Sequence, residues 1–124
     1  MGKEDKQLLL TDLCARLPYG VKCTTKSSWN GIYTIEGYKD NRFFLDCPIY
    51  DEGDDEWMIE SIVPYLRPMS SMTDREEFVL TLYNAFTEPR STELKVDVYN
   101  KQHLDYRGLI EKGLALEAPE GMYN

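Results

Sequence analysis

Histidine and cysteine are both scarce in this chain. Its 124 residues include one histidine, His103, and three cysteines that form no C-x-x-C pair. A zinc hydrolase or a two-histidine metal site needs more imidazoles, and a structural zinc site normally needs a closely spaced cysteine pair. We therefore expect no metal and no other cofactor. The odd, small number of cysteines predicts that Cys14, Cys23 and Cys47 are reduced, half-buried thiols rather than a disulfide framework.

Long apolar runs and phosphate-binding motifs are also missing. No apolar run approaches the roughly 18 residues of a membrane span, and the leucine run at 8–10 is too short for a secretory signal. The chain contains no G-x-x-x-x-G-K-[ST], G-x-G-x-x-G or G-x-S-x-G, which excludes the common nucleotide-binding loops and the serine-hydrolase elbow. These absences predict a cytoplasmic protein that has no membrane partner.

Few residue types remain for catalysis. An enzyme would have to pair one of the cysteines with His103 as nucleophile and base. The simpler interpretation is a histidine near a helix end with its ring half exposed, because each cysteine falls at an inward position of its predicted element. A small enzyme that uses a cysteine and His103 is therefore our third functional hypothesis, behind two that involve no catalysis.

Positive charge is in the minority, with 14 lysines and arginines against 22 acids and a net charge of -8. Six acids fall close together, and removing these six from the 22 leaves 16 acids against 14 bases in the rest of the chain. The six are Asp51, Glu52, Asp54, Asp55, Glu56 and Glu60. An acidic surface repels phosphate backbones and no basic cluster offsets it, so direct binding to nucleic acid is disfavoured.

The acidic loop over 50–56 has several interpretations. An EF-hand loop needs its glycine in the sixth position, whereas Gly53 is already third, so a calcium loop is not indicated. A solvated run of charges is the simplest interpretation. A mimic of DNA phosphates, or another nucleic-acid-directed regulator, is our second functional hypothesis, although such mimics usually spread their acids over a whole face.

The residues that are present are typical of one small α+β domain over 1–124. Hydrophobic residues make up 42% of the chain and aromatic residues 12%, which is enough for one core at this length. A leucine stripe predicts a helix over 4–17, before Pro18. Apolar residues then alternate from 21 to 47, with turns at 27–31 and 39–41, which predicts an antiparallel sheet whose buried face includes Tyr33 and Ile35.

The segment 57–68 completes a predicted β meander over 21–68. Residues 57–59 predict a short fourth strand, and Pro64 and Pro68 favour a single helical turn between them. One helix, a few curled strands and such a turn suggest an SH3-like, partly open barrel.

The C-terminal half predicts a helical part over 73–113. Thr73 and Glu76 form a capping box, and the helix that it opens is expected to reach about Phe86. The helix carries a stripe that we expect to be buried, which comprises Phe78, Val79, Leu82, Tyr83 and Phe86.

The remaining segments are less regular. Residues 92–102 fit either a helix or a strand, and we favour a helix. A short helix over 105–112 with Gly113 as its left-handed cap is expected next. Residues 114–124 then form an extended tail.

Three sequence blocks carry a resemblance. They are residues 12–22 (DLCARLPYGVK), 64–73 (PYLRPMSSMT) and 105–119, which begins DYRGLIEKGLA. They resemble an abundant group of short proteins from gut bacteria and their phages or other mobile elements, a group with no assigned activity. The resemblance implies a single-domain accessory protein of a phage or mobile element, and it supplies no catalytic residues.

The polar cluster Asp105, Tyr106 and Arg107 has two interpretations. As a recognition patch, Arg107 would grip a carboxylate or phosphate while Tyr106 stacks on the ligand. As a structural clamp, Asp105 would cap a helix and Arg107 would pair across to the barrel. We favour the clamp.

Aromatic residues are numerous, with nine tyrosines and two tryptophans. Amphipathic rings on or beside the predicted barrel are typical of a protein interface. We predict a non-enzymatic protein-interaction module that binds a protein partner, whose identity stays unknown, through this surface, the acidic loop, or both. The candidate aromatic residues are Trp29, Tyr33, Tyr38, Tyr50, Trp57 and Tyr65.

Overall fold

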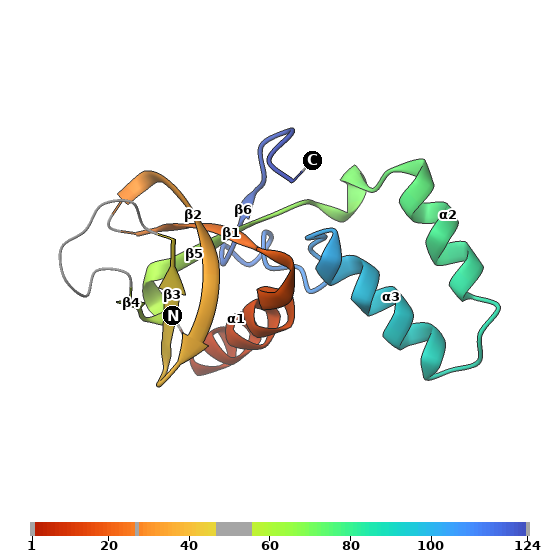
Figure 1. Cartoon of the computed structure of the whole chain (residues 1–124), viewed down its shortest axis with the longest axis horizontal. Coiled ribbons are helices and arrows are strands. Elements are labelled where there is room, and N and C mark those ends of the chain that lie inside the picture. Colours follow the sequence, from red (N-terminus) through yellow and green to blue (C-terminus); the bar gives the residue numbers. More distant parts are fainter. Residues whose placement is uncertain (1, 27, 47–55, 124) are drawn as a thin grey trace.

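The computed structural model describes residues 2–26, 28–46 and 56–123. Figure 1 shows two parts: a body in which the first helix packs against a curled sheet, and an arm of two helices that extends to one side. The prediction of an α+β fold with an N-terminal helix, a small sheet and helices in the C-terminal half is confirmed.

The first helix, α1, spans Lys3–Arg16, close to the predicted 4–17. A 3-10 turn over Leu17–Tyr19 follows, and Gly20 ends it at a φ of 68°. Glycine suits this position because it lacks the Cβ that penalises left-handed backbone. Leu9 and Leu13 are fully buried, as their four-residue spacing predicts.

Six strands form one sheet in the order β4-β3-β2-β1-β5-β6. The first five pair antiparallel, whereas β6 pairs parallel with β5. The sheet is therefore mixed, and it does not close into a barrel across the residues that the structure describes. The strands are β1 (Lys22–Thr25), β2 (Ser28–Lys39), β3 (Arg42–Leu45), β4 (Glu56–Trp57), β5 (Ile62–Leu66) and β6 (Leu116–Glu117).

The turn of one hairpin agrees with the prediction from the sequence, and the turn of the other differs from it. Asp40 and Asn41 both have positive φ, at 52° and 65°, and join β2 to β3 as predicted. The turn predicted at 27–31 is wrong in extent, because β2 already begins at Ser28. Gly31 lies inside the strand, where a Cβ would come within 2.3 Å of the Tyr33 hydroxyl. Gly31 therefore leaves room for the Tyr33 side chain and does not form a turn.

The helical turn predicted between Pro64 and Pro68 is wrong, because the segment forms β5. Four of the five β5 residues are buried, so both faces of the strand are covered and no polar alternation marks it. A strand buried on both faces cannot be distinguished by period from other short apolar runs. The 3-10 turns instead flank the strand, at Ile59–Ser61 and Met69–Ser71.

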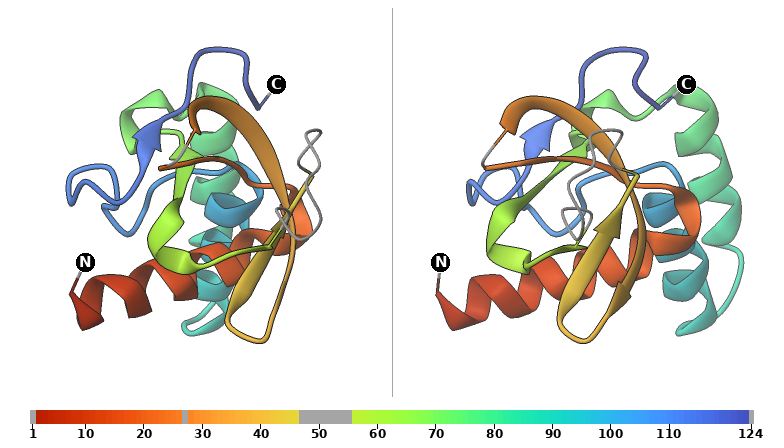
Figure 2. Two further views of the ribbon diagram at one scale, coloured as in Figure 1. Left: turned by 90° about the vertical axis from the view of Figure 1, so that its left-hand side faces the viewer. Right: turned by 60° about the vertical axis from the view of Figure 1, so that its left-hand side comes forward.

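The core lies between α1 and the sheet, and Figure 2 shows the helix running beneath the strands. Leucines of α1 pack there with inward residues of the strands and with apolar residues near the C-terminus. Tyr33, Ile35, Phe43 and Leu45 belong to this core, as the alternation predicts. Leu109 and Leu114 join the same core from the other end of the chain.

The arm consists of α2 (Asp74–Tyr83) and α3 (Arg90–Lys101). The predicted capping box is confirmed: the Glu76 amide donates to the Thr73 hydroxyl at 3.2 Å, and the Thr73 amide donates to the Glu76 carboxylate at 2.9 Å. The helix predicted within 92–102 is also confirmed. The short helix predicted over 105–112 is wrong, because the chain makes turns there, although Gly113 does adopt the left-handed φ of 75°.

The C-terminal tail returns to the body. The Ala118 amide donates to the Leu66 carbonyl, which continues the pairing of β6 with β5. The Tyr123 hydroxyl accepts from the Lys22 amide at 2.8 Å and donates to the Tyr65 carbonyl at 2.6 Å. None of the helices in the described parts of the chain is long and apolar enough to span a bilayer.

Candidate functional site

A buried ion cluster joins α1 to the C-terminal part of the body. Asp12 and Arg16 are both fully buried, and the Arg16 guanidinium donates to the Asp12 carboxylate at 2.8 and 3.0 Å. Arg107 donates to the same carboxylate at 2.8 Å from 95 positions away. Arg16 also donates to the Leu104 carbonyl at 2.6 Å. Buried charges need such complete pairing, because an unpaired charge in a core is strongly destabilising.

The side chains of Asp105, Tyr106 and Arg107 all make contacts inside the molecule. The Asp105 carboxylate accepts from the amides of Leu109 and Ile110 at 2.8 and 3.0 Å, although it caps a turn and not a helix. Arg107 pairs with α1 and not with a barrel strand, and its guanidinium lies 4.4 Å from the centre of the Tyr106 ring. Tyr106 in turn stacks on Tyr99 of α3. These contacts tie the arm to the body.

His103 lies at the junction of arm and body. It is buried, so the expectation of a half-exposed ring is wrong. Its ring stacks on Tyr123 with the ring centres 4.0 Å apart, and it hydrogen-bonds to the Tyr19 backbone. Burial lowers the pKa of His103 to about 4, and the positive charge of Arg16 adds to this shift. The ring is therefore neutral near pH 7.

The thiols do not form a dyad with this histidine within the described residues. Burial raises the pKa of Cys23 to about 12 and also raises the pKa of Cys14. A thiol with a raised pKa is protonated at neutral pH and is a poor nucleophile. The His103 Nδ1 atom has no hydrogen-bond partner among the residues described. Cys47 lies outside the described residues.

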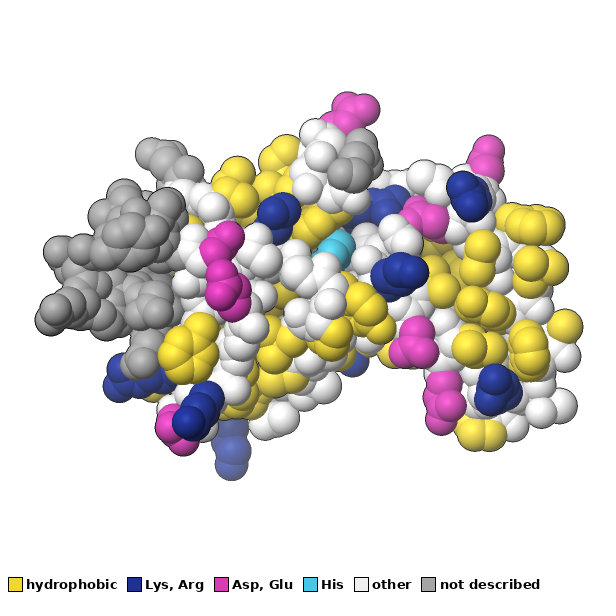
Figure 3. Space-filling view, in the orientation of Figure 1, with side chains coloured by type: hydrophobic (Ala, Val, Ile, Leu, Met, Phe, Trp, Pro, Cys, Tyr) yellow, Lys and Arg dark blue, Asp and Glu magenta, His cyan; other side chains and the backbone are white. Residues whose placement is uncertain are grey.

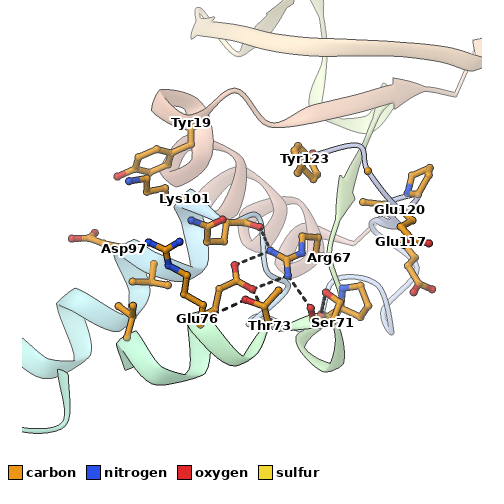
Figure 4. A pocket seen from close by; sticks show the side chains of 18 of the residues that line it. Tyr19, Arg67, Ser71, Thr73, Glu76, Asp97, Lys101, Glu117, Glu120 and Tyr123 are labelled. Carbon is orange, nitrogen blue, oxygen red and sulfur yellow. Dashed lines mark hydrogen bonds and ion pairs between the residues drawn. The ribbon is translucent and has the colours of Figure 1, made fainter. Parts of the chain in front are cut away.

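Arg67 fixes the base of the arm. It follows β5, and its guanidinium makes two hydrogen bonds to the Glu76 carboxylate, at 2.8 and 2.9 Å. The same guanidinium donates to the backbone carbonyls of Ser71 and Gln102, so one side chain bridges the start of α2 and the end of α3 (Figure 4). Hydrogen bonds from Arg67 lower the pKa of Glu76. A bidentate pair of this kind fixes orientation as well as distance.

A hollow of about 1130 Å³ lies beside this ion pair, between the arm and the C-terminal tail. Figure 4 shows Tyr19 and Tyr123 at its body side and Asp97 and Lys101 of α3 on its arm side. Three bases and four acids line its wall, and Arg67 is already paired with Glu76. The described residues of the wall therefore carry charges of both signs in nearly equal number.

The outer face of α2 is the largest departure from the expected packing. None of the ten α2 residues is buried against the described part of the chain. The side chains of Phe78, Leu82 and Phe86 are 62%, 53% and 46% exposed, so the prediction that this stripe is buried is wrong for these three. Val79 and Tyr83 are half-buried and face the hollow instead. Hydrophobic side chains gather visibly over the arm in Figure 3.

The residues predicted to form an aromatic binding surface are spread over different environments. Tyr33 is in the core, so it is not available to a partner, and Tyr38 and Tyr65 are half-buried. The side chains of Trp29, Trp57 and Glu56 lie outside what the structure describes, as do Tyr50 and the acids Asp51, Glu52, Asp54 and Asp55. Glu60, the last acid of that group, pairs with Lys6 at 2.6 Å.

Sequence periodicity identified Phe78, Leu82 and Phe86 as an apolar stripe but assigned them to the core. The signal for their exposure was weak: a short helix, acidic in its first turn, followed closely by a proline. Among the described residues, no group of three or more histidine, cysteine or acidic side chains is placed to hold a metal ion.

Comparison of the chain with protein-family models, curated proteins and solved structures finds no match. The resemblance to short proteins of gut bacteria and their phages therefore stays a prediction.

Proposed function

We propose that this protein is a non-enzymatic interaction module that binds another protein chain through the exposed apolar face of α2. The observation that carries the proposal is the exposure of Phe78 and Leu82 on α2, and of Phe86 in the turn that follows it, on an arm that projects from the body. Contiguous exposed apolar patches on a folded protein are typical of binding surfaces. Amphipathic helices bind partners through anchors at this four-residue spacing.

The contacts at the base of the arm support this role. Arg67 holds the two helices of the arm together at one end, and Tyr106 stacks against α3. A face that is held in place before binding loses less conformational entropy when the partner arrives. In this proposal the body holds the arm in place, and the buried charged groups of the body stabilise its fold.

The chemistry of the remaining groups is consistent with binding instead of turnover. The His103 pKa of about 4 makes the ring a poor base at neutral pH, and the raised pKa of Cys23 keeps that thiol protonated. The predicted cytoplasmic, phage-accessory role remains part of this proposal.

A photo-crosslinker placed at residue 78 tests the proposal in the cells that produce the protein. Benzoylphenylalanine is close to Phe78 in shape, and the matched control carries it at Ile32, which is 55% exposed on β2. We expect a protein adduct from residue 78 that is weak or missing from residue 32. The adduct is identified by mass spectrometry and its affinity is remeasured with purified components.

The purified pair provides the decisive measurement. Leu82→Glu should weaken binding at least tenfold, or about 1.4 kcal/mol, because a charge replaces an apolar anchor. Ile32→Glu adds the same charge to an exposed residue of the body and should leave the affinity unchanged. Equal adducts from both positions, or an affinity that Leu82→Glu does not alter, would contradict the proposal.

A further inference from the structure

We infer that the C-terminal tail, residues 116–123, is released from the body when His103 binds a proton, and that its release opens the hollow. The tail covers one face of the His103 ring, because Tyr123 stacks on that face with the ring centres 4.0 Å apart. The ring itself is buried. This inference concerns the junction of arm and body, so it goes beyond the proposed function and does not depend on the α2 face.

The His103 side chain has no hydrogen-bond acceptor for a second proton. Its ring hydrogen-bonds to the Tyr19 backbone, and its Nδ1 atom has no partner among the described residues. The bond to Tyr19 is therefore made by Nε2–H, which leaves Nδ1 as the atom that would take the proton. An N–H group at Nδ1 would be buried without an acceptor, which costs free energy.

The charges that act on this ring are all positive. Burial is the largest cause of the lowered pKa of His103. Arg16 on α1, Arg67 after β5 and Lys22 on β1 lower this pKa further through their charges. Both arginines already pair with carboxylates of their own, and burial raises the pKa of Tyr123, which therefore stays neutral. The groups that act on the ring thus supply no negative charge to an imidazolium, and such an ion is stable only where water can reach it.

The tail is the element around His103 that is attached by a short strand and a few hydrogen bonds. Its strand β6 is two residues long and exposed, and the Ala118 amide donates to the β5 backbone. At its end, the Tyr123 hydroxyl accepts from the Lys22 amide and donates to the Tyr65 carbonyl. Figure 2 shows the tail at the outside of the molecule. Moving the tail therefore brings water to the ring while the helices and the other strands stay in place.

Release of the tail changes the hollow and the sheet together. Residues 117–121 and Tyr123 line the hollow, so the hollow loses that wall and opens to solvent. Strand β5 loses its parallel partner β6 at the same time. An unpaired strand edge is then accessible beside the widened hollow.

The direction and size of the pH effect follow from the two environments of the ring. The pKa of His103 is about 4 while the tail is in place, and it should return to about 6.5 when water reaches the ring. Between these values the released form binds the proton and the closed form does not. The closed form is therefore favoured above about pH 6.5, and the equilibrium constant for release should rise about thirtyfold from pH 7.5 to pH 5.

Amide hydrogen exchange of the full-length chain, followed by NMR and corrected for the intrinsic effect of pH, tests the inference. The reporters are the amides of Lys22 and Ala118, which are bonded to the tail hydroxyl and to β5. The control is the Ile35 amide, which donates to the Val21 carbonyl in the core. We expect the opening constants of both reporters to rise about thirtyfold between pH 7.5 and pH 5, with no effect of about 0.5 M urea. The control amide should exchange more slowly and respond to urea, because it opens only when the whole protein unfolds.

Two variants separate the sensing of pH from the strength of attachment. His103→Asn should abolish the rise at the Ala118 amide. Tyr123→Phe keeps an aromatic ring over His103 but removes both hydroxyl hydrogen bonds. It should raise the opening constant at Ala118 roughly tenfold at both pH values and leave the thirtyfold ratio between them unchanged.

The wild-type measurement decides the inference even if a variant fails to fold. Reporter amides that exchange at the rate of Ile35, with the same response to urea, would show that the tail is not released separately and would overturn it. A rise of less than about threefold, or a rise that His103→Asn preserves, would overturn it as well. The crosslinking test of the α2 face is unaffected by any of these results, so the two proposals fail separately.

Discussion

Similar apolar patterns in the sequence are buried in the body and exposed in the arm. Helix α1 and helix α2 both carry apolar residues at four-residue spacing, yet Leu9 and Leu13 are fully buried while Phe78 and Leu82 are 62% and 53% exposed. The body also buries a complete ion cluster, whereas the arm is held at its base by a partly exposed arginine–glutamate pair. An apolar stripe therefore indicates a face that another surface could cover. It does not indicate whether that surface belongs to the same chain.

The largest expected effect tests the body. Asp12→Ala should lower the free energy of unfolding by about 3 to 5 kcal/mol, because it leaves the Arg16 guanidinium buried without its carboxylate. Urea denaturation followed by circular dichroism measures the change. The exposed Lys6–Glu60 pair provides the control, since Glu60→Ala should alter stability by no more than the error of the measurement. A small effect of Asp12→Ala would mean that the cluster is more hydrated than its burial indicates.

A matched pair of leucine truncations compares the two parts directly. Leu13→Ala should destabilise the protein by about 3 kcal/mol, because it leaves a cavity between α1 and the sheet. Leu82→Ala removes the same atoms from an exposed site and should change stability by less than about 0.5 kcal/mol. Both are measured by chemical denaturation at the same protein concentration. Similar losses for the two variants would remove the distinction between body and arm.

The third prediction concerns the junction between the two parts. The His103 pKa is about 4 in the folded protein and about 6.5 in an unfolded chain. Between these values the unfolded chain binds the proton and the folded chain does not, so stability is complete above about pH 6.5 and falls as the pH approaches 4. The loss from this residue should be on the order of 3 kcal/mol by pH 4.

The variant His103→Asn isolates that contribution. Asparagine tolerates the left-handed backbone found at residue 103, where φ is 58°. Unfolding free energies are measured from pH 4 to pH 7 for both proteins, and the slope should be shallower in the variant. Parallel slopes would show that acidic residues, and not the imidazole, account for the pH dependence.

Several elements could be predicted because their signals are local. The capping box at Thr73, the turn at Asp40 and Asn41, and the alternation that buries Phe43 and Leu45 each depend on residues within a few positions of one another. Their physical causes, which are capping hydrogen bonds, left-handed backbone and a period of two, are visible in the sequence.

Other elements could not be predicted because their causes are distant in the chain. Strand β5 is covered on both faces, and its partners β1 and β6 come from opposite ends of the sequence. The burial of His103 depends on Tyr123 and Tyr19, which no local pattern connects to it. Phe78 is exposed because no other described element packs over it. The periodicity of the helix cannot predict which elements will pack against it.

The sequence by itself determined the local elements and the absence of common catalytic and nucleotide-binding motifs. Backbone preferences and side-chain periods act over one or two turns, so a short segment contains all the residues that determine them. Only the tertiary structure decided that Asp12 would share its carboxylate with Arg107, and that one apolar stripe would be buried while the other stayed exposed. Those outcomes depend on which distant segments come into contact in the folded chain, because burial is set by those contacts.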